Sequence, residues 1–363
     1  AQRLDFARFS DAQLRECYLA EYRAIREFSD KPITTNFMAN ECPATDVFAW
    51  AKEIDIISND HYLTAEDERN FVGLSLAADL TRGAAGGAPW MLMEHSTSGV
   101  NWQPRNVAKL PGELARNSLA HVARGSDSVL YFQWRASRYG AEKFHSAMLP
   151  HGGKRTKVWQ EVVELGNRLT KFDDVQGSRV HSEVAILWDT ESHWAQDLEW
   201  RPTIDHDHKE RTRAFYERTW RDGITTDFVH PSADLSSYKL VLVPALYLLS
   251  DADAENLRQY VAGGGTLVVS YFSAIVDEND TVHANGYLGA LADVLGLQVE
   301  EFHPLRANNT VQVSGLAGAL SADVWVDDLM INSAQVQANY VDGPLPGAPA
   351  LTRNSFGKGQ AWY

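Results

Sequence analysis

Residues 89–102, PWMLMEHSTSGVNW, combine a short apolar run with a charged end. The run from Trp90 to Met93 has the length and composition of a strand covered on both faces, as parallel strands are. It ends on Glu94, and His95, several hydroxyl residues and Trp102 follow. A carboxylate at the end of a buried strand must be solvated, paired or functional, because burying it alone is costly. The segment therefore predicts a parallel strand whose C-terminal end carries polar chemistry.

The same pattern recurs on both sides of this segment. Apolar or β-branched runs of strand length occupy residues 33–38, 55–62 and 128–134, and each ends in polar or aromatic side chains. Predicted helices separate them, so strand and helix alternate four times. Polar residues at the C-terminal ends of parallel strands are typical of a (β/α)8 barrel, whose sites lie on that face. A whole barrel has eight strands in about 250 residues, so the pattern predicts half of one.

The first helix is predicted from a capping-box pattern, in which Ser10 is followed by Gln13. Further helices are expected at 47–54, 65–87, 112–125 and 156–169. The helix that opens at Ser10 is also marked by an apolar stripe at helical spacing, formed by Leu14, Cys17, Tyr18, Tyr22, Ile25 and Phe28.

A second unit is predicted from about residue 183. Strands are expected at 183–189, 225–229, 239–246 and 266–272, with helices at 209–223 and 251–265 between them, which is an open doubly wound α/β pattern. Shorter edge strands follow residue 305. Gly263–Gly265 close a helix rather than open one, so they predict a helix C-terminus and not a phosphate loop. The predicted domains are residues 1–176 and 183–363.

Composition excludes several classes of partner. The formal net charge is −15, which disfavours binding to nucleic acid or to an anionic membrane surface. The longest apolar run, residues 240–249, is about half of what spans a bilayer. Cys17 and Cys42 are the two cysteines. Free thiols in a reducing cytoplasm are the favoured interpretation, and a single disulfide stays possible.

Other site candidates each have a structural alternative. Trp102 could pack in the core or stack on a sugar ring, and Tyr62 could be buried or could donate a hydrogen bond to Glu94. Glu142 and His145 lie three residues apart on one side of a helical turn. They could bind metal, but no further ligands accompany them, and Arg135 or Arg138 could pair with Glu142. His206 and His208 flank an aspartate in what is predicted to be a solvated loop.

The segments TTNFM, PWMLMEHSTSGVNWQP, YFQWRASRYGAEKFHSAMLPHGG and YVAGGGTLVVSYFSAIVDEND closely resemble the β-galactosidases of glycoside hydrolase family 42. The resemblance implies that Glu94 is the catalytic nucleophile, on the seventh barrel strand. It also implies that Trp102, Tyr62, Glu142 and His145 contact substrate. It further implies that the second domain resembles class I glutamine amidotransferases without their active site and forms a homotrimer.

The resemblance places the general acid/base, a glutamate preceded by asparagine, on the fourth barrel strand, upstream of Ala1. Asp60 and Glu41 are carboxylates near strand ends, but nothing matches either to that role. The chain is therefore expected to be a fragment that is inactive by itself. No cofactor or metal is expected in it, since the family's zinc site belongs to an upstream cysteine cluster.

The predicted function is hydrolysis of terminal β-D-galactosides with retention, through a covalent intermediate on Glu94. One alternative is a related glycosidase acting on α-L-arabinopyranosides, whose hydroxyl pattern matches that of galactose. Another is a sugar-binding or oligomerisation protein without catalysis.

Overall fold

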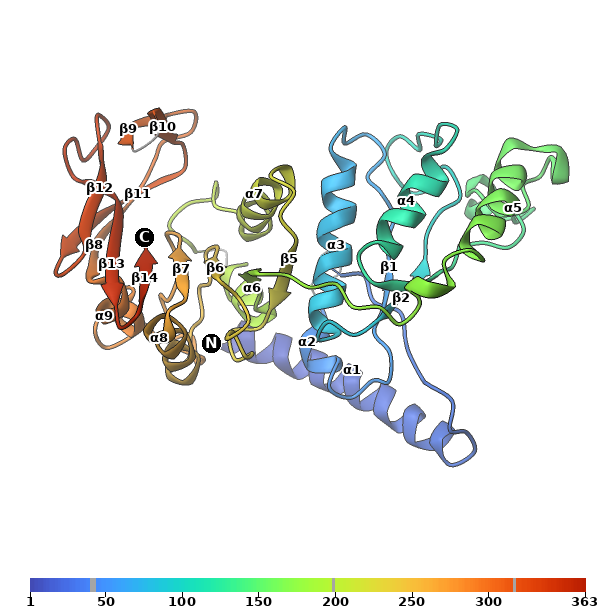
Figure 1. Cartoon of the computed structure of the whole chain (residues 1–363), viewed down its shortest axis with the longest axis horizontal. Coiled ribbons are helices and arrows are strands. Elements are labelled where there is room, and N and C mark those ends of the chain that lie inside the picture. The colour runs from blue at the N-terminus through green and yellow to red at the C-terminus, as the bar shows by residue number, and fades with distance from the viewer. Residues whose placement is uncertain (40–43, 198–199, 316–317) are drawn as a thin grey trace. The chain divides into compact units, whose positions relative to one another are not determined.

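The computed structural model describes residues 1–39, 44–197, 200–315 and 318–363. Glu41 and Cys42 therefore lie outside the described residues. The chain divides into two compact units, Leu14–His181 and Ser182–Tyr363, the second of which also includes Ala1–Gln13 (Figure 1).

The unit Leu14–His181 is built on a small parallel sheet with the strand order β1-β2-β3. Its strands are β1 (Ser58–Asp60), β2 (Trp90–Glu94) and β3 (Ser126–Val129). Its main helices are α1 (Gln2–Arg26, shared with the other unit), α2 (Val47–Trp50), α3 (Asn70–Ala84), α4 (Glu113–Val122) and α5 (Lys157–Leu169). Three short 3-10 helices complete it: η1 (Ala141–Phe144), η2 (Gly153–Arg155) and η3 (Asp173–Val175).

The central strand β2 is buried as its apolar composition requires. Trp90 and Leu92 are 0% exposed, and they pack with Ala78 of α3. Chain order places α3 between β1 and β2 and α4 between β2 and β3, and both helices lie beside the sheet (Figure 1). Strands and helices therefore alternate as in successive β/α units of a barrel.

The segment 33–38 is not a strand, contrary to the prediction. It runs beside β1, but most of its contacts there use side chains. Thr34 Oγ1 donates to the carbonyl oxygen of Ile56 at 2.6 Å, and Ser58 Oγ donates to that of Thr35. The backbone amide of Asp60 donates to the carbonyl oxygen of Phe37 at 2.6 Å. Because these bonds do not form a continuous backbone ladder, the segment is extended without pairing as a strand.

The first helix begins before the predicted capping box. Helix α1 starts at Gln2, so Ser10 lies within it and its Oγ donates to the carbonyl oxygen of Phe6 at 2.8 Å. Serine inside a helix commonly makes this bond to the preceding turn. The predicted apolar stripe is only partly covered: Tyr18 packs against Trp50, whereas Phe28 is 89% exposed.

The unit with residues 182–363 contains a nine-stranded sheet. The strand order is β10-β9-β12-β13-β14-β7-β6-β4-β5. Strands β5, β4, β6, β7 and β14 are parallel, and this order is that of a doubly wound fold. These strands are β4 (Val184–Leu187), β5 (Thr226–Val229), β6 (Leu240–Val243), β7 (Thr266–Val269) and β14 (Gly359–Trp362).

Antiparallel strands extend the sheet at one edge, and β8 pairs with β11 in a separate ribbon. These strands are β8 (Leu297–Pro304), β9 (Val311–Gly315), β10 (Gly318–Ala322), β11 (Trp325–Ile331), β12 (Gln335–Tyr340) and β13 (Pro349–Phe356). The helices are α6 (Thr190–Gln196), α7 (His208–Arg221), α8 (Asp251–Gly263), the 3-10 helix η4 (Gly289–Leu291) and α9 (Ala292–Leu295).

Helix α8 ends at Gly263, and Gly264 adopts a φ of 124°. The predicted helix C-terminus is therefore present, with glycine where the backbone leaves the right-handed region.

The two histidines of the segment 206–208, where α7 begins, are not solvated, contrary to the prediction. His206 is 3% exposed and His208 is 5% exposed. Gln196 bridges them: its Oε1 lies 2.7 Å from His206 Nε2, and its Nε2 lies 3.2 Å from His208 Nδ1. The two histidines are hydrogen-bonded core residues. In the described part of the chain, no helix combines the length and the apolar character needed to cross a membrane.

Candidate active site

Glu94 is the last residue of β2, where its carboxylate leaves the buried part of the sheet. Its Oε2 accepts a hydrogen bond of 2.7 Å from Tyr62 Oη. Its Oε1 lies 3.5 Å from the amide nitrogen Asn36 Nδ2. The carboxylate is half-buried. One of its oxygens is held by a short hydrogen bond, and the other makes only a long contact.

Tyr62 connects Glu94 to two other predicted site residues. Its ring meets Trp102 edge-on at a centroid distance of 5.5 Å and His145 at 6.0 Å. Burial, the hydrogen bond to Glu94 and the nearby negative charges all raise the pKa of the Tyr62 phenol. The phenol therefore stays protonated and acts as a donor at neutral pH.

Trp102 and Glu142 are exposed, whereas His145 is buried. The Trp102 side chain is 55% exposed, so the indole surface is open to a ligand. His145 is 4% exposed, and its Nδ1 lies 2.8 Å from the carbonyl oxygen of Ser146. That contact makes Nδ1 the protonated nitrogen and leaves Nε2 as an acceptor. Among the described residues, Nε2 has no hydrogen-bond partner.

Glu142 lies in the 3-10 helix η1, and His145 is the residue that ends it. The amide of His145 donates to the carbonyl oxygen of Glu142 at 2.9 Å, so the predicted turn is present as a 3-10 turn. Among the described residues, no ion pair joins Glu142 to Arg135 or Arg138. The guanidinium of Arg138 instead lies over the ring of Tyr139.

Asp60 belongs to this site, although the sequence patterns assigned it no role. It is the partner of Glu94 in the β1–β2 register, and it is 7% exposed. Its Oδ2 accepts a hydrogen bond of 2.8 Å from Asn36 Nδ2. Burial, together with the negative charge of Glu94, raises the pKa of Asp60 to about 6. The signal that could have found it is its place at the end of the strand beside β2.

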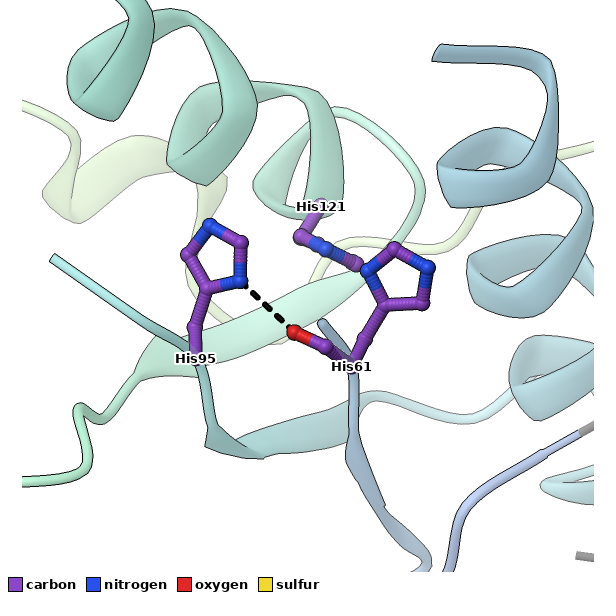
Figure 2. Close-up of side chains that lie close together, drawn as sticks. All are labelled: His61, His95 and His121. Carbon is purple, nitrogen blue, oxygen red and sulfur yellow. Dashed lines mark hydrogen bonds between the residues drawn. The ribbon is translucent and has the colours of Figure 1, made fainter. Parts of the chain in front are cut away.

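Three buried histidines adjoin the site (Figure 2). His61 precedes Tyr62, His95 follows Glu94, and His121 comes from α4. Within the described ranges they are the one group of histidine, cysteine and acidic side chains with metal-ligand spacing, with ligand atoms within 4.8 Å of one another.

Two observations oppose a metal at the three histidines. His95 Nδ1 is engaged by the carbonyl oxygen of His61 at 2.7 Å, and the amine of Lys109 lies 3.3 Å from His95 Nε2. A metal ion would have to displace one of these groups. No pattern in the sequence brought these three histidines together.

Comparison with known proteins gives matches along nearly the whole chain. Residues 1–172 match the family model described as β-galactosidase of glycoside hydrolase family 42, and residues 182–363 match the β-galactosidase trimerisation domain of that family. The chain is 49% identical over 364 residues to a β-galactosidase from Arthrobacter sp., which covers 100% of this chain and 52% of the relative. It is 41% identical over 367 residues to one from Geobacillus kaustophilus, covering 100% of this chain and 54% of that protein.

The fold is shared with solved structures. The crystal structure of a β-galactosidase from Bacillus circulans sp. alkalophilus superposes with a TM-score of 0.96 at 37% identity, covering 99% of this chain and 54% of the other. These matches confirm the predicted fold class: the C-terminal half of a (β/α)8 barrel followed by an α/β trimerisation domain. The chain spans about half the length of the curated relatives it matches.

Proposed function

The chain belongs to the β-galactosidases of glycoside hydrolase family 42, and from that premise we propose that it forms part of a retaining β-galactosidase whose nucleophile is Glu94. The observation that carries the proposal is the Glu94 carboxylate at the end of β2, which Tyr62 holds by one oxygen. A nucleophilic carboxylate must be fixed in direction, and the phenol holds one of its oxygens at 2.7 Å.

In the proposed mechanism, Glu94 Oε1 attacks the anomeric carbon of the galactoside. The carbon–oxygen bond to the leaving group breaks, its electron pair stays on the leaving oxygen, and a general acid protonates that oxygen. The acid is proposed to be a second glutamate, in a part of the polypeptide outside this chain. Water, deprotonated by the same group, then attacks the glycosyl-enzyme and releases galactose with retained configuration.

The sugar is proposed to contact Trp102, Glu142 and His145. The exposed indole surface of Trp102 offers a flat apolar surface to the C–H groups of a pyranose. The acceptor His145 Nε2 and the Glu142 carboxylate would hydrogen-bond hydroxyl groups. A buried acceptor such as His145 Nε2 rejects a sugar that lacks the matching hydroxyl.

The finer assignments for the whole protein are also proposals. Residues 1–176 would form part of the catalytic barrel, and residues 183–363 would assemble as a homotrimer, which the match to a trimerisation domain supports. Cys17 is an exposed free thiol, which favours a reducing compartment such as the cytoplasm. Sedimentation equilibrium of the full-length protein tests the trimer, and a mass of one or two protomers would exclude it.

The decisive experiment replaces the nucleophile in the full-length polypeptide. Glu94→Gln should lower kcat for nitrophenyl β-D-galactopyranoside by a factor on the order of 10^4 or more, because no covalent intermediate can form. Glu164→Gln is the matched control: this exposed carboxylate on α5 forms an ion pair with Arg168, four residues on, and its substitution should leave kcat unchanged. A 2-fluoro galactoside should label Glu94, as peptide mass mapping would show. Undiminished turnover by the Glu94→Gln variant would refute the proposal.

The same assay separates the alternatives. Faster turnover of nitrophenyl α-L-arabinopyranoside than of the galactoside would indicate the related glycosidase. Galactose binding by the full-length protein without hydrolysis of either substrate would indicate a sugar-binding protein.

A further inference from the structure

The backbone of His61 is hydrogen-bonded by two residues at the end of β2, Glu94 and His95. Its amide donates a hydrogen bond of 2.9 Å to the carbonyl oxygen of Glu94. Its carbonyl oxygen accepts one of 2.7 Å from His95 Nδ1, which Figure 2 shows as a dashed line. The same carbonyl belongs to the peptide that leads into Tyr62. The phenol of Tyr62 donates a hydrogen bond of 2.7 Å to Glu94 Oε2.

These three bonds close a ring between residues 61–62 and residues 94–95. The position of the phenol depends on the orientation of the His61–Tyr62 peptide, because that peptide carries the Tyr62 backbone. His95 is the only described side chain that donates to the carbonyl oxygen of His61. Loss of this donor would free the peptide to rotate and would misplace the hydroxyl from Glu94.

Lys109 and the carbonyl oxygen of His61 favour the same tautomer of His95, because the carbonyl can only accept a hydrogen bond from Nδ1. Lys109 Nζ lies 3.3 Å from His95 Nε2, and it also donates to the carbonyl oxygen of Ser96 and, at 3.0 Å, to Ser96 Oγ. Burial lowers the pKa of Lys109 to about 7, and in its protonated form Lys109 has donors and no acceptor, so Nε2 then presents its lone pair. In a neutral imidazole the proton then sits on Nδ1, where it can reach the carbonyl oxygen of His61.

The surroundings of His95 keep its imidazole neutral. The side chain is 0% exposed. Burial first, and then the charge of Lys109, hold the pKa of His95 well below its usual value. Three other rings surround it, His61 at 6.4 Å, Tyr131 at 6.2 Å and His121 at 5.7 Å between ring centroids, and none of them is a carboxylate.

We propose that His95 is a positioning residue for the reaction, and that Lys109 sets its tautomer. Together they hold the His61–Tyr62 peptide so that the Tyr62 hydroxyl donates to Glu94. This inference rests on the proposed role of Glu94 as nucleophile, and it assigns functions to two side chains that do not touch the substrate.

A double-mutant cycle with Tyr62 tests the proposal in the full-length protein. His95→Leu removes the donor and should lower kcat/KM roughly 10- to 40-fold, because a misplaced Tyr62 hydroxyl loses its hydrogen bond to the half-buried, charged Glu94. In a Tyr62→Phe background there is no hydroxyl left to misplace, so the same substitution should cost less than about 3-fold. Strong coupling of this kind is expected only when one residue acts through the other.

Three further variants make the cycle decisive. His95→Asn supplies an amide donor near the place of Nδ1 and should restore activity to within about 5-fold of wild type. Lys109→Met leaves His95 in place and should also lower kcat/KM, with a smaller effect in the Tyr62→Phe background. This variant replaces His95→Leu in the cycle if His95→Leu does not fold. His121→Asn is the control, because it alters the same buried cluster without a bond to residues 61–62, and its effect should add to that of Tyr62→Phe.

Additive effects of His95→Leu and Tyr62→Phe, or of Lys109→Met and Tyr62→Phe, would overturn the proposal. Failure of the proposed function would be seen separately, as full activity of the Glu94→Gln variant. Thermal melting of every variant shows whether a loss of activity follows from unfolding, and the conclusion then rests on the variants that melt like wild type.

Discussion

Replacing Tyr62 with phenylalanine removes one hydroxyl group and leaves the aromatic packing in place. The lost bond is the 2.7 Å hydrogen bond from Tyr62 Oη to Glu94 Oε2. The ring would keep its edge-on contacts with Trp102 and His145. The substitution therefore tests what the hydrogen bond contributes, separately from the shape of the site.

The structure sets the expected magnitude. A hydrogen bond to a charged group contributes about 1.5–3 kcal/mol, and Glu94 is only half-buried, so the lower half of that range applies. At about 1.4 kcal/mol for each factor of ten, kcat/KM should fall roughly 10- to 40-fold.

The assay compares kcat/KM for a nitrophenyl β-galactoside between pH 4 and 8 in the full-length protein. Tyr22→Phe is the matched control, since Tyr22 Oη also donates to a carboxylate, Asp55 Oδ1, at 3.0 Å. The control should match wild type in kcat/KM. A loss of kcat/KM of less than about 3-fold in Tyr62→Phe would refute the reasoning.

Two further predictions concern the sugar contact and acid stability. Trp102→Ala should raise KM about 10-fold, because a 55% exposed indole surface is lost, whereas an unchanged KM in steady-state kinetics would exclude stacking. His208 is buried, and burial lowers its pKa to about 3. His208 therefore stays neutral in the folded state down to about pH 3, whereas in the unfolded state it binds a proton below about pH 6.5. The free energy of unfolding falls as the pH falls from about 6.5 to 3. His208→Gln should reduce the loss of unfolding free energy between pH 7 and pH 5 by about 2 kcal/mol, as urea denaturation at the two pH values would measure; equal losses in both proteins would contradict the assignment.

Local sequence patterns predicted most elements of the fold. Strand β2 is identified by its apolar run and its charged end, and α5 begins one residue after Thr156, whose hydroxyl caps the helix. The parallel strands of the unit 182–363 were equally clear, because strands covered on both faces are continuously apolar. The hydrogen bond from Tyr62 to Glu94 also lies where the sequence led us to expect it.

Other features were mispredicted because they depend on distant partners. The β-branched segment 33–38 has strand composition, yet it does not form a regular backbone ladder with β1. Ser10 and Gln13 match a capping-box pattern, yet α1 begins earlier in the chain, at Gln2. His206 and His208 are polar in sequence, and only the packing around Gln196 makes them buried.

The sequence by itself determined most of the segments that become strands and helices, and which acidic residue stands at the end of the central strand β2, because these follow from periodicity and local composition. Tertiary structure alone decided the raised pKa of Asp60, the contact of Lys109 with His95 and the hydrogen bond from His95 to the carbonyl oxygen of His61. Burial and hydrogen bonding are set by neighbours that are tens of residues away along the chain. A one-dimensional pattern contains the residues of such a network but not the distances between them.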